Sequence, residues 1–397
     1  MTQIHLDMFL TAGIGVLALL TGRFLTRKVT FLRRFCIPEP VSGGILFSLI
    51  TLALYGWFRV EAVFDGTLKD LCMMIFFTSV GFQSDVRVLR QGGRPLVVLI
   101  ALVAVLIVCQ NLLSVGIAVG MGLDPVIGMA SGSIPMSGGH GTAGGFGALL
   151  DSHGVPGTSS LALAAATFGL VAGSLIGGPL AEGLIERKKL ASVAPGKGID
   201  VRPEEPEAGR TDYHALFRAV CQIVLAIALG ALLNRLFALT GITFPTYFGA
   251  LVSAALIRNL TPLVPRLPAC EMKEIVSLGN VCLALFLGMA MVSLRLWELA
   301  DLALPLAVIL AAQALLILLY ARFAAFPLLG KDYDAAVLVS GLCGFGLGAT
   351  PTAMANMSAV CSRYHYAVKP FVIVPIVGAM FVDLINTTVV TLFFNLI

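Results

Sequence analysis

The sequence predicts an all-α polytopic membrane protein made of two inverted five-span repeats, each with a re-entrant hairpin loop. Composition is the first reason: 58% of the 397 residues are hydrophobic and 12% are charged, against about 25% charged in a soluble domain. The second reason is a series of apolar runs near the length of about 20 residues that a bilayer crossing requires. The third is a pair of apolar segments that Gly and Pro interrupt.

Ten apolar runs are predicted to cross the lipid bilayer in succession. They lie near residues 8–22, 41–58, 70–83, 96–120, 161–185, 215–239, 246–257, 274–294, 303–323 and 371–394. The first residues lack the basic flank and the small-residue cleavage site of a signal peptide. We therefore interpret the first run as a retained span.

The two interrupted segments, 126–150 and 335–360, decide the topology. If each enters and leaves the membrane on one side, all but four of the 26 Lys and Arg residues fall on the same side of the bilayer. The four exceptions are Arg59, Lys69, Arg235 and Arg295. Because cytoplasmic loops collect Lys and Arg, we expect both termini outside and the central loop inside. If each interrupted segment instead crossed the whole membrane, the basic central loop would lie outside.

The chain divides into two halves that resemble each other. Residues 186–213 are polar, Pro-rich and charged, which is typical of a flexible linker, and they separate residues 1–185 from residues 214–397. Three residue pairs are separated by the same interval along the chain: Pro95 and Pro305, Asp124 and Asp334, and Gly138 and Gly348. With five spans per half, the second copy enters the membrane from the opposite side, as in inverted-repeat transporters.

The interrupted segments are predicted to form a binding site. Irregular backbone at membrane depth is tolerated only when it is buried in protein or lines a watery cavity. Helix N-termini at such a tip bind carboxylates, and exposed carbonyl groups bind a cation such as Na⁺. The predicted substrate-binding residues are Ser137, Gly138, Gly139, His140, Gly141, Thr142, Gly346, Gly348, Thr350, Thr352 and Asn356.

Asp383 is the carboxylate deepest in a continuous span, and acids at this depth are costly and usually functional. Asn386 follows about one helical turn later on the same face. With Gly344 and Pro351 of the second interrupted segment, these residues are the predicted Na⁺ site. A structural salt bridge is the alternative for Asp383.

Other polar residues in the apolar runs have two interpretations each. His140 either donates to a substrate carboxylate or makes a structural hydrogen bond. Gln110, Asn111 and Asn280 are expected to join helices by hydrogen bonds. Arg363 either pairs with a substrate carboxylate or extends to the membrane surface.

Several function classes are excluded by absent patterns. The basic residues lie in short clusters between apolar runs, which does not indicate nucleic-acid binding. The eight single cysteines lack metal-binding spacing. HExxH is absent, and residues 344–348 (GFGLG) lack the Asp of an aspartyl intramembrane protease. We expect no enzyme and no organic cofactor. A channel stays open as an alternative, because Gly-rich re-entrant loops also form filters.

Five motifs closely resemble the bacterial sodium/glutamate symporter family. They are IPEPVSGG (37–44), SGGHGT (137–142), ATFGLVAGSLIGGP (166–179), KDYDAAVLVSGLCGFGLGATPTAMANM (331–357) and VGAMFVDLIN (377–386). The resemblance covers nearly the whole chain. Ala143 and Leu342 stand where close relatives are expected to carry Gly and His.

The resemblance implies Na⁺-coupled symport of L-glutamate across the cell inner membrane by alternating access, with both termini periplasmic. A more distant similarity to sodium/citrate carriers implies a homodimer and an elevator-type movement. The alternative within the same class is a Na⁺- or H⁺-coupled carrier of another dicarboxylate, such as citrate or malate.

Overall fold

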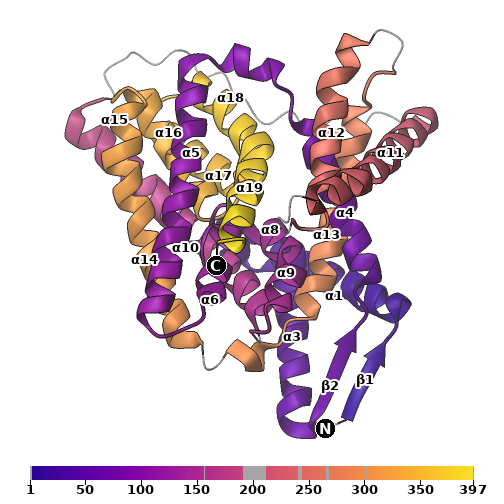
Figure 1. The fold of residues 1–397 in the computed structure, drawn as a ribbon. Helices are drawn as coiled ribbons and strands as arrows, with labels where there is room; N and C mark the ends of the chain where they lie inside the picture. The colour runs from indigo at the N-terminus through magenta and orange to yellow at the C-terminus, as the bar shows by residue number, and fades with distance from the viewer. Residues whose placement is uncertain are drawn as a thin grey trace.

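The computed structural model describes residues 2–155, 157–190, 212–239, 244–264, 268–299 and 302–396. Most of the predicted linker, residues 191–211, lies outside this part of the chain. The described residues are mainly helical, as predicted, with one small sheet (Figure 1).

The first half runs from a short strand to a long helix. Its elements are β1 (Thr2–Leu6), α1 (Met8–Lys28), α2 (Thr30–Arg34), α3 (Glu39–Phe58), β2 (Val60–Phe64), α4 (Thr67–Gln83), α5 (Arg87–Gly120), α6 (Pro125–Ala130), α7 (Ser133–Met136), α8 (Gly139–Gly145), α9 (Gly147–Ser152) and α10 (Thr158–Lys188).

The second half contains the remaining helices. They are α11 (Tyr213–Ala238), α12 (Phe248–Leu260), the 3₁₀ helices η1 (Thr261–Leu263) and η2 (Leu296–Leu299), α13 (Met272–Val292), α14 (Ala303–Tyr320), α15 (Phe326–Leu328), α16 (Tyr333–Gly346), α17 (Thr350–Arg363), α18 (Val368–Ile376), α19 (Val382–Phe394) and the π-helical turns η3 (Ala321–Ala325) and η4 (Val377–Phe381).

Aspartates begin several of these helices by accepting a hydrogen bond from a free backbone N–H group of the first turn. These capping residues are Asp7 of α1, Asp124 of α6, Asp212 of α11 and Asp332 of α16. Of the repeat-related pair Asp124 and Asp334, only Asp124 caps a helix, because Asp332 caps α16 and Asp334 lies in its first turn.

Seven helices of the described residues are long and apolar enough to cross a membrane. They are α1, α3, α5 from Gly93 onward, α10, α11, α13 and the stretch from Ala303 to Leu328. The other three predicted spans are shorter or divided: α4 has 17 residues, α12 has 13, and η4 separates α18 from α19. The multi-pass class is confirmed, and the count of ten spans stays a prediction.

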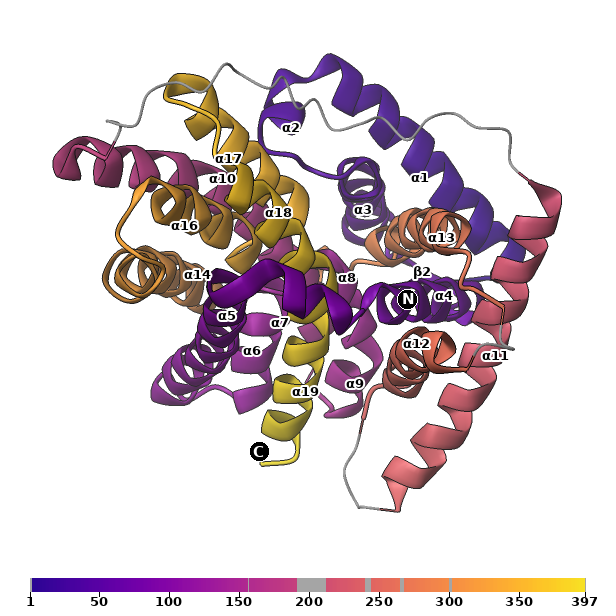
Figure 2. The same cartoon turned by 90° about the horizontal axis from the view of Figure 1, so that it is seen from above.

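The helices form two groups that lie side by side when seen from above (Figure 2). The six-helix group consists of α1, α3, α4, α11, α12 and α13, and the hairpin group consists of α5–α10 and α14–α19. Glycines allow close helix approach in the six-helix group. A Cβ on Gly22 of α1 would lie 1.8 Å from the Glu39 carbonyl oxygen of α3, and one on Gly230 of α11 would lie 2.4 Å from the Ala250 Cα of α12.

The hairpin group contains a long helix that is almost wholly buried. All residues of α16 except Asp334 are buried, and the helix packs against α10, α17 and the end of α14. Apolar side chains of α5, α14 and α16, including Leu106, Ile317 and Phe345, share one core. Such a core supports a helix end that reaches the middle of the molecule.

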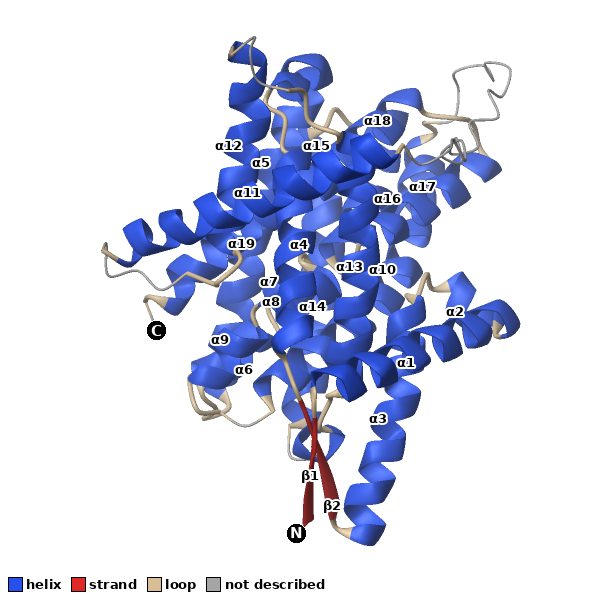
Figure 3. Cartoon of the chain, turned by 90° about the vertical axis from the view of Figure 1, so that its right-hand side faces the viewer, coloured by secondary structure: helices blue, strands red, loops and turns tan. Residues whose placement is uncertain are grey.

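The sheet was not predicted. β1 and β2 pair in parallel from Thr2–Val60 to Leu6–Phe64, and Figures 1 and 3 place them with the N-terminus at one end of the molecule. We call this end the sheet side. The end of α10 and the start of α11, which flank the predicted linker, lie at the opposite end (Figure 1), called the linker side below.

Candidate functional site

Two helical hairpins meet at their tips in the middle of the molecule. Hairpin 1 consists of α6–α9, and hairpin 2 consists of α16 and α17. At the tip of hairpin 1, Gly139 has a φ of +61°, a conformation that only glycine adopts readily. A Cβ on Gly139 would lie 2.9 Å from the carbonyl oxygen of Gly348 in hairpin 2. Glycine is therefore required both for the turn and for the approach of the two tips.

A cavity of about 470 Å³ lies beside the tips. Nine predicted site residues line it: Ser137, Gly138, Gly139, His140, Gly141, Gly348, Thr350, Pro351 and Asp383. The opposite wall comes from the six-helix group, with Phe76 of α4 and Asn280 and Leu283 of α13. The lining extends to Pro38 and Gln83, at the start of α3 and the end of α4. The cavity therefore lies between the two helix groups.

Two helices begin at this cavity without a side-chain cap. α17 begins at Thr350, and α8 begins at Gly139. At neither N-terminus does a capping side chain accept a hydrogen bond from the backbone, so first-turn N–H groups keep their capacity to donate. The positive ends of these helix dipoles favour an anion here.

Asp383 brings a carboxylate to the same cavity from α19. Its Oδ1 accepts a hydrogen bond from the Thr142 hydroxyl at 3.2 Å. Within the described ranges, no Lys, Arg or His nitrogen lies within ion-pair distance of Asp383. The alternative of a structural salt bridge therefore has no partner in this part of the chain.

Asn386 anchors hairpin 1 instead of facing the cavity. Its Nδ2 donates to the Ser133 carbonyl oxygen at 3.0 Å, and the Ser133 hydroxyl lies 2.6 Å from Asn386 Oδ1. The same hydroxyl lies 3.0 Å from Asn111 Oδ1 of α5. Ser133 thereby joins hairpin 1 to helices on both sides, a role that the sequence analysis missed.

Gln110 of α5 links the two hairpins. Its Nε2 donates to the Gly346 carbonyl oxygen at 2.7 Å, and its Oε1 accepts from the Ser137 hydroxyl at 2.7 Å. Gln313 of α14 donates to the Gln110 carbonyl oxygen. The expectation that Gln110 and Asn111 make hydrogen bonds between helices is confirmed, whereas Asn280 lines the cavity.

Four predicted residues of hairpin 2 lie behind the cavity wall. A Cβ on Gly344 would lie 2.4 Å from Ala353 Cα, so this glycine allows α16 and α17 to pack closely. Gly346 packs against Leu106 and Ile317. The Asn356 amide donates to the Gly173 carbonyl oxygen, and Thr352 is fully buried. None of the four is among the residues that line the cavity.

His140 and Arg363 are both engaged by protein groups. His140 Nε2 lies 2.9 Å from the hydroxyl of Thr167 on α10, a partner that the sequence analysis did not single out although Thr167 interrupts an apolar run. Arg363 lies at the exposed end of hairpin 2, where it forms ion pairs with Glu182 at 2.7 Å and Glu186 at 3.7 Å on α10. Arg363 does not line the cavity.

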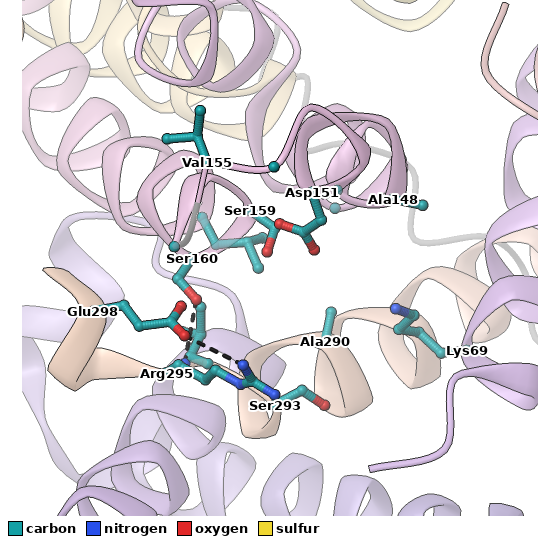
Figure 4. Close-up of a pocket in the computed structure, with 16 residues that line it drawn as sticks. Lys69, Ala148, Asp151, Val155, Ser159, Ser160, Ala290, Ser293, Arg295 and Glu298 are labelled. Carbon is teal, nitrogen blue, oxygen red and sulfur yellow. Dashed lines mark hydrogen bonds and ion pairs between the residues drawn. The ribbon is translucent and has the colours of Figure 1, made fainter. Parts of the chain in front are cut away.

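A second cavity, of about 560 Å³, lies between α9, the start of α10 and the end of α13 (Figure 4). Lys69, Asp151, Arg295 and Glu298 bring both signs of charge to its lining. Arg295 forms ion pairs with Glu298 and with Glu61 of β2, each at 3.2 Å. This cavity therefore lies on the sheet side of hairpin 1.

Comparison with known proteins gives one consistent family. A family profile described as "Sodium/glutamate symporter" matches residues 4–366. The chain is 40% identical over 398 residues to the sodium/glutamate symporter of Escherichia coli (strain K12), covering 99% of this chain and 98% of that protein. It is 37% identical over 395 residues to the sodium/glutamate symporter of Haemophilus influenzae, covering 98% and 97% of the two chains.

Proposed function

Because the chain belongs to the sodium/glutamate symporter family, we propose that it carries L-glutamate across the membrane together with Na⁺. The family is one of transporters, not of enzymes. One observation supports placing the site between the hairpins: Gly139 and Gly348 approach each other beside a cavity that the Asp383 carboxylate also lines.

Glutamate is bound at this cavity by the uncapped helix ends. One carboxylate accepts hydrogen bonds from N–H groups and the hydroxyl at the start of α17, near Thr350. The other carboxylate faces the start of α8, near Gly139 and His140. Both helix ends carry partial positive charge. Backbone carbonyl groups of the tips and Asp383 are the acceptors for the ammonium group.

Asp383 is the principal Na⁺ ligand in this proposal. Its carboxylate supplies the negative charge that compensates a dehydrated cation, and Pro351 lines the cavity with it. Asn386 acts on the site indirectly, because its amide holds Ser133 of hairpin 1. Gly344 acts through the close packing of α16 on α17.

The halves 1–185 and 214–397 form an inverted repeat, and the linker 186–213 joins them. Each half supplies three helices to the six-helix group and one hairpin to the other group. The glycine-mediated crossing of α1 and α3 has a counterpart in α11 and α12. Hairpins 1 and 2 are the re-entrant loops of this repeat, since their uncapped tips lie at one cavity.

Transport proceeds by an elevator-type movement of the hairpin group against the six-helix group, in a homodimer of the cell inner membrane. Both termini are periplasmic and the linker is cytoplasmic, because this orientation places most Lys and Arg residues inside. The cavity beside the tips then faces the cytoplasm, and the second cavity lies on the periplasmic side.

The test is uptake of labelled L-glutamate into liposomes that contain the purified protein. We expect uptake with an inward Na⁺ gradient, little uptake when choline replaces Na⁺, and competition by unlabelled glutamate but not by citrate or malate. Uptake driven by a pH gradient alone, or blocked by citrate, would support the dicarboxylate alternative. Light scattering of the detergent-purified protein gives its molecular mass and tests the homodimer.

A further inference from the structure

A third cavity, of about 330 Å³, lies between the last turns of α10 and the end of α14. Both helices belong to the hairpin group and contact each other, and their ends lie on the side of that group that faces away from the six-helix group (Figure 2). The apolar lining includes Leu175, Leu180 and Leu318, and the charged lining consists of Arg187 and Arg322. We call this cavity the arginine groove.

The arginine groove follows the axis of α10 for about three turns. Its lining residues recur at every fourth position from Leu175 to Arg187, which places them on one face of the helix. This stretch is about 18 Å long, and one leaflet of a bilayer contributes about 15 Å to the hydrocarbon core. Gly183 keeps the groove open, because a Cβ at this position would meet nothing within 4 Å. The groove is therefore long enough to hold one acyl chain along the helix.

Both arginines lie at the linker-side end of the groove. Arg187 is in the last turn of α10, and α10 ends at the linker side (Figure 1). Arg322 follows Leu318 by about one helical turn and lies about 28 Å along the helix from Ala303, where α14 begins. This length is close to the hydrocarbon thickness of about 30 Å. A helix that begins at one membrane surface therefore places Arg322 near the other surface.

The charges of the two arginines are not balanced by nearby acids. Among the described residues, no carboxylate lies within ion-pair distance of either guanidinium group. Glu182 and Glu186, the acids on the last turns of α10, pair instead with Arg363 of α17. The guanidinium of Arg322 lies over the ring of Phe323, 5.4 Å from its centroid, and this contact leaves the positive charge in place. The groove thus combines an apolar wall with two cations at one end.

We propose that the arginine groove binds an anionic diacyl phospholipid of the linker-side leaflet. The two guanidinium groups donate hydrogen bonds to the phosphate oxygens, a geometry for which arginine is well suited. One acyl chain lies against Leu175, Leu180 and Leu318. Free phosphate would match only the arginines, whereas a phospholipid matches the arginines and the apolar wall together. Basic pockets between membrane helices bind anionic headgroups in this way.

Native mass spectrometry of the detergent-purified protein tests the role of the charges. The protein is titrated with phosphatidylglycerol, and the measured quantity is the lipid concentration at which half of the protein carries one bound lipid. Arg187→Gln or Arg322→Gln should raise this concentration about 5-fold, and the double variant about 30-fold, since one cation near a membrane surface contributes about 1 kcal/mol. Arg27→Gln is the matched control, because Arg27 is an exposed arginine in the last turn of α1 and lies outside the groove. It should leave the concentration near the wild-type value.

A second pair of variants tests the apolar part of the groove without changing charge. Gly183→Leu places a side chain in the open space of the groove, so we expect phosphatidylglycerol binding to weaken about 10-fold, as for the lost burial of about two methylene groups. Gly178→Leu adds the same side chain to α10 outside the groove lining, where a Cβ also meets nothing within 4 Å. This control should bind the lipid as the wild type does.

Two further titrations identify the ligand. Phosphatidylcholine with the same acyl chains should bind more weakly than phosphatidylglycerol and should not respond to the arginine variants. Inorganic phosphate at an equal concentration should not displace phosphatidylglycerol. Equal binding of the two lipids, displacement by inorganic phosphate, or equal shifts in the test and control variants would each overturn the proposal. Glutamate and Na⁺ are absent from these titrations, so their outcome is independent of the proposed transport.

Discussion

Hairpin 1 reaches the cavity through four short helices, α6 to α9, whereas hairpin 2 reaches it through two helices of 14 residues each. Polar side chains hold hairpin 1 in place: Ser133, Ser137, His140 and Thr142 each bond to a side chain of another helix. Hairpin 2 is held mainly by glycine-mediated backbone packing. The Leu347 carbonyl oxygen, for example, would lie 2.0 Å from a Cβ on Gly169.

The two hairpins thus show two ways in which a membrane protein holds an interrupted helix in place: hydrogen bonds from polar side chains, and close backbone packing at glycines. A polar anchor places ionisable and hydroxyl groups beside the ligand, so its mutations are expected to alter ion and substrate affinity. Backbone packing places only the tip near the ligand, so its mutations are expected to displace the tip as a whole.

The largest effect is expected from Asp383→Asn, which removes charge beside hairpin 1 and keeps an oxygen that accepts from Thr142. Loss of a charged partner costs about 1.5–3 kcal/mol, so Na⁺ half-saturation of glutamate uptake should rise on the order of 10- to 100-fold. Na⁺-dependent thermal stabilisation should fall in parallel. A variant that keeps the wild-type Na⁺ response would remove Asp383 from the ion site.

Gly169→Ala is expected to have the next largest effect, through hairpin 2. The new Cβ would overlap the Leu347 carbonyl oxygen at 2.0 Å, and such overpacking costs about 1–3 kcal/mol. Gly178→Ala in the same helix is the control, because its Cβ meets nothing within 4 Å. The melting temperature and the rate of glutamate uptake should both fall in Gly169→Ala and stay near the wild-type values in Gly178→Ala. Equal behaviour of the two variants would contradict the packing role.

Ser133→Ala tests the polar anchor of hairpin 1 with a smaller expected effect. It leaves Asn386 and Asn111 without the serine hydroxyl, at a cost of about 1–2 kcal/mol in the free energy of unfolding. Ser340→Ala in hairpin 2 removes a buried hydroxyl that has no partner among the described residues, so it should be neutral or stabilising. Comparable destabilisation by both changes would show that the two hairpins do not differ in this respect.

The smallest effect concerns the linker-side end of α4, outside the membrane-spanning helices. There the Ser84 hydroxyl donates to the Met380 carbonyl oxygen of the hairpin group, and Asp85 forms ion pairs with Arg87 and Arg258. The hydrogen bond from Arg87 and the charge of Arg258 lower the pKa of Asp85 from 3.8 to about 2.

Because this folded-state pKa is depressed, the ionised Asp85 stabilises the fold above about pH 4, and the contribution is lost as pH falls through about 2. Asp85→Asn should therefore lower the melting temperature by about 2–4 °C at pH 7. The difference from wild type should vanish near pH 2. A difference in melting temperature that stays constant between pH 7 and pH 2 would contradict the stabilising role of the ionised Asp85. Asp70→Asn, at an exposed ion pair with Lys69, is the control without an expected change.

Some site residues were predictable because their chemistry is conspicuous in an apolar chain. Adjacent glycines such as Gly138 and Gly139 weaken any helix, and a carboxylate such as Asp383 is costly in a span. Both tips, and the acid that lines the same cavity, were therefore predictable from the sequence. That they approach each other depends on long-range packing, which no local pattern encodes.

Other features lacked a distinguishing signal. Glycine serves close helix packing as well as ligand approach, so Gly344 and Gly346 could not be separated from Gly348 by residue type. The strands TQIHL and VEAVF are five residues each, too short to predict a parallel pairing across the three helices α1 to α3.

The ion pairs of Arg363 with Glu182 and Glu186 fasten the outer end of hairpin 2 to the last turns of α10. Only about two dozen residues join the end of α10 at Lys188 to the start of α11 at Tyr213. Yet a chain of that length has a maximum reach on the order of 80 Å, well beyond a hydrocarbon thickness of about 30 Å. This linker therefore sets no limit on a movement of one helix group past the other, and the tightest covalent limit comes from the three residues that join Gln83 of α4 to Arg87 of α5.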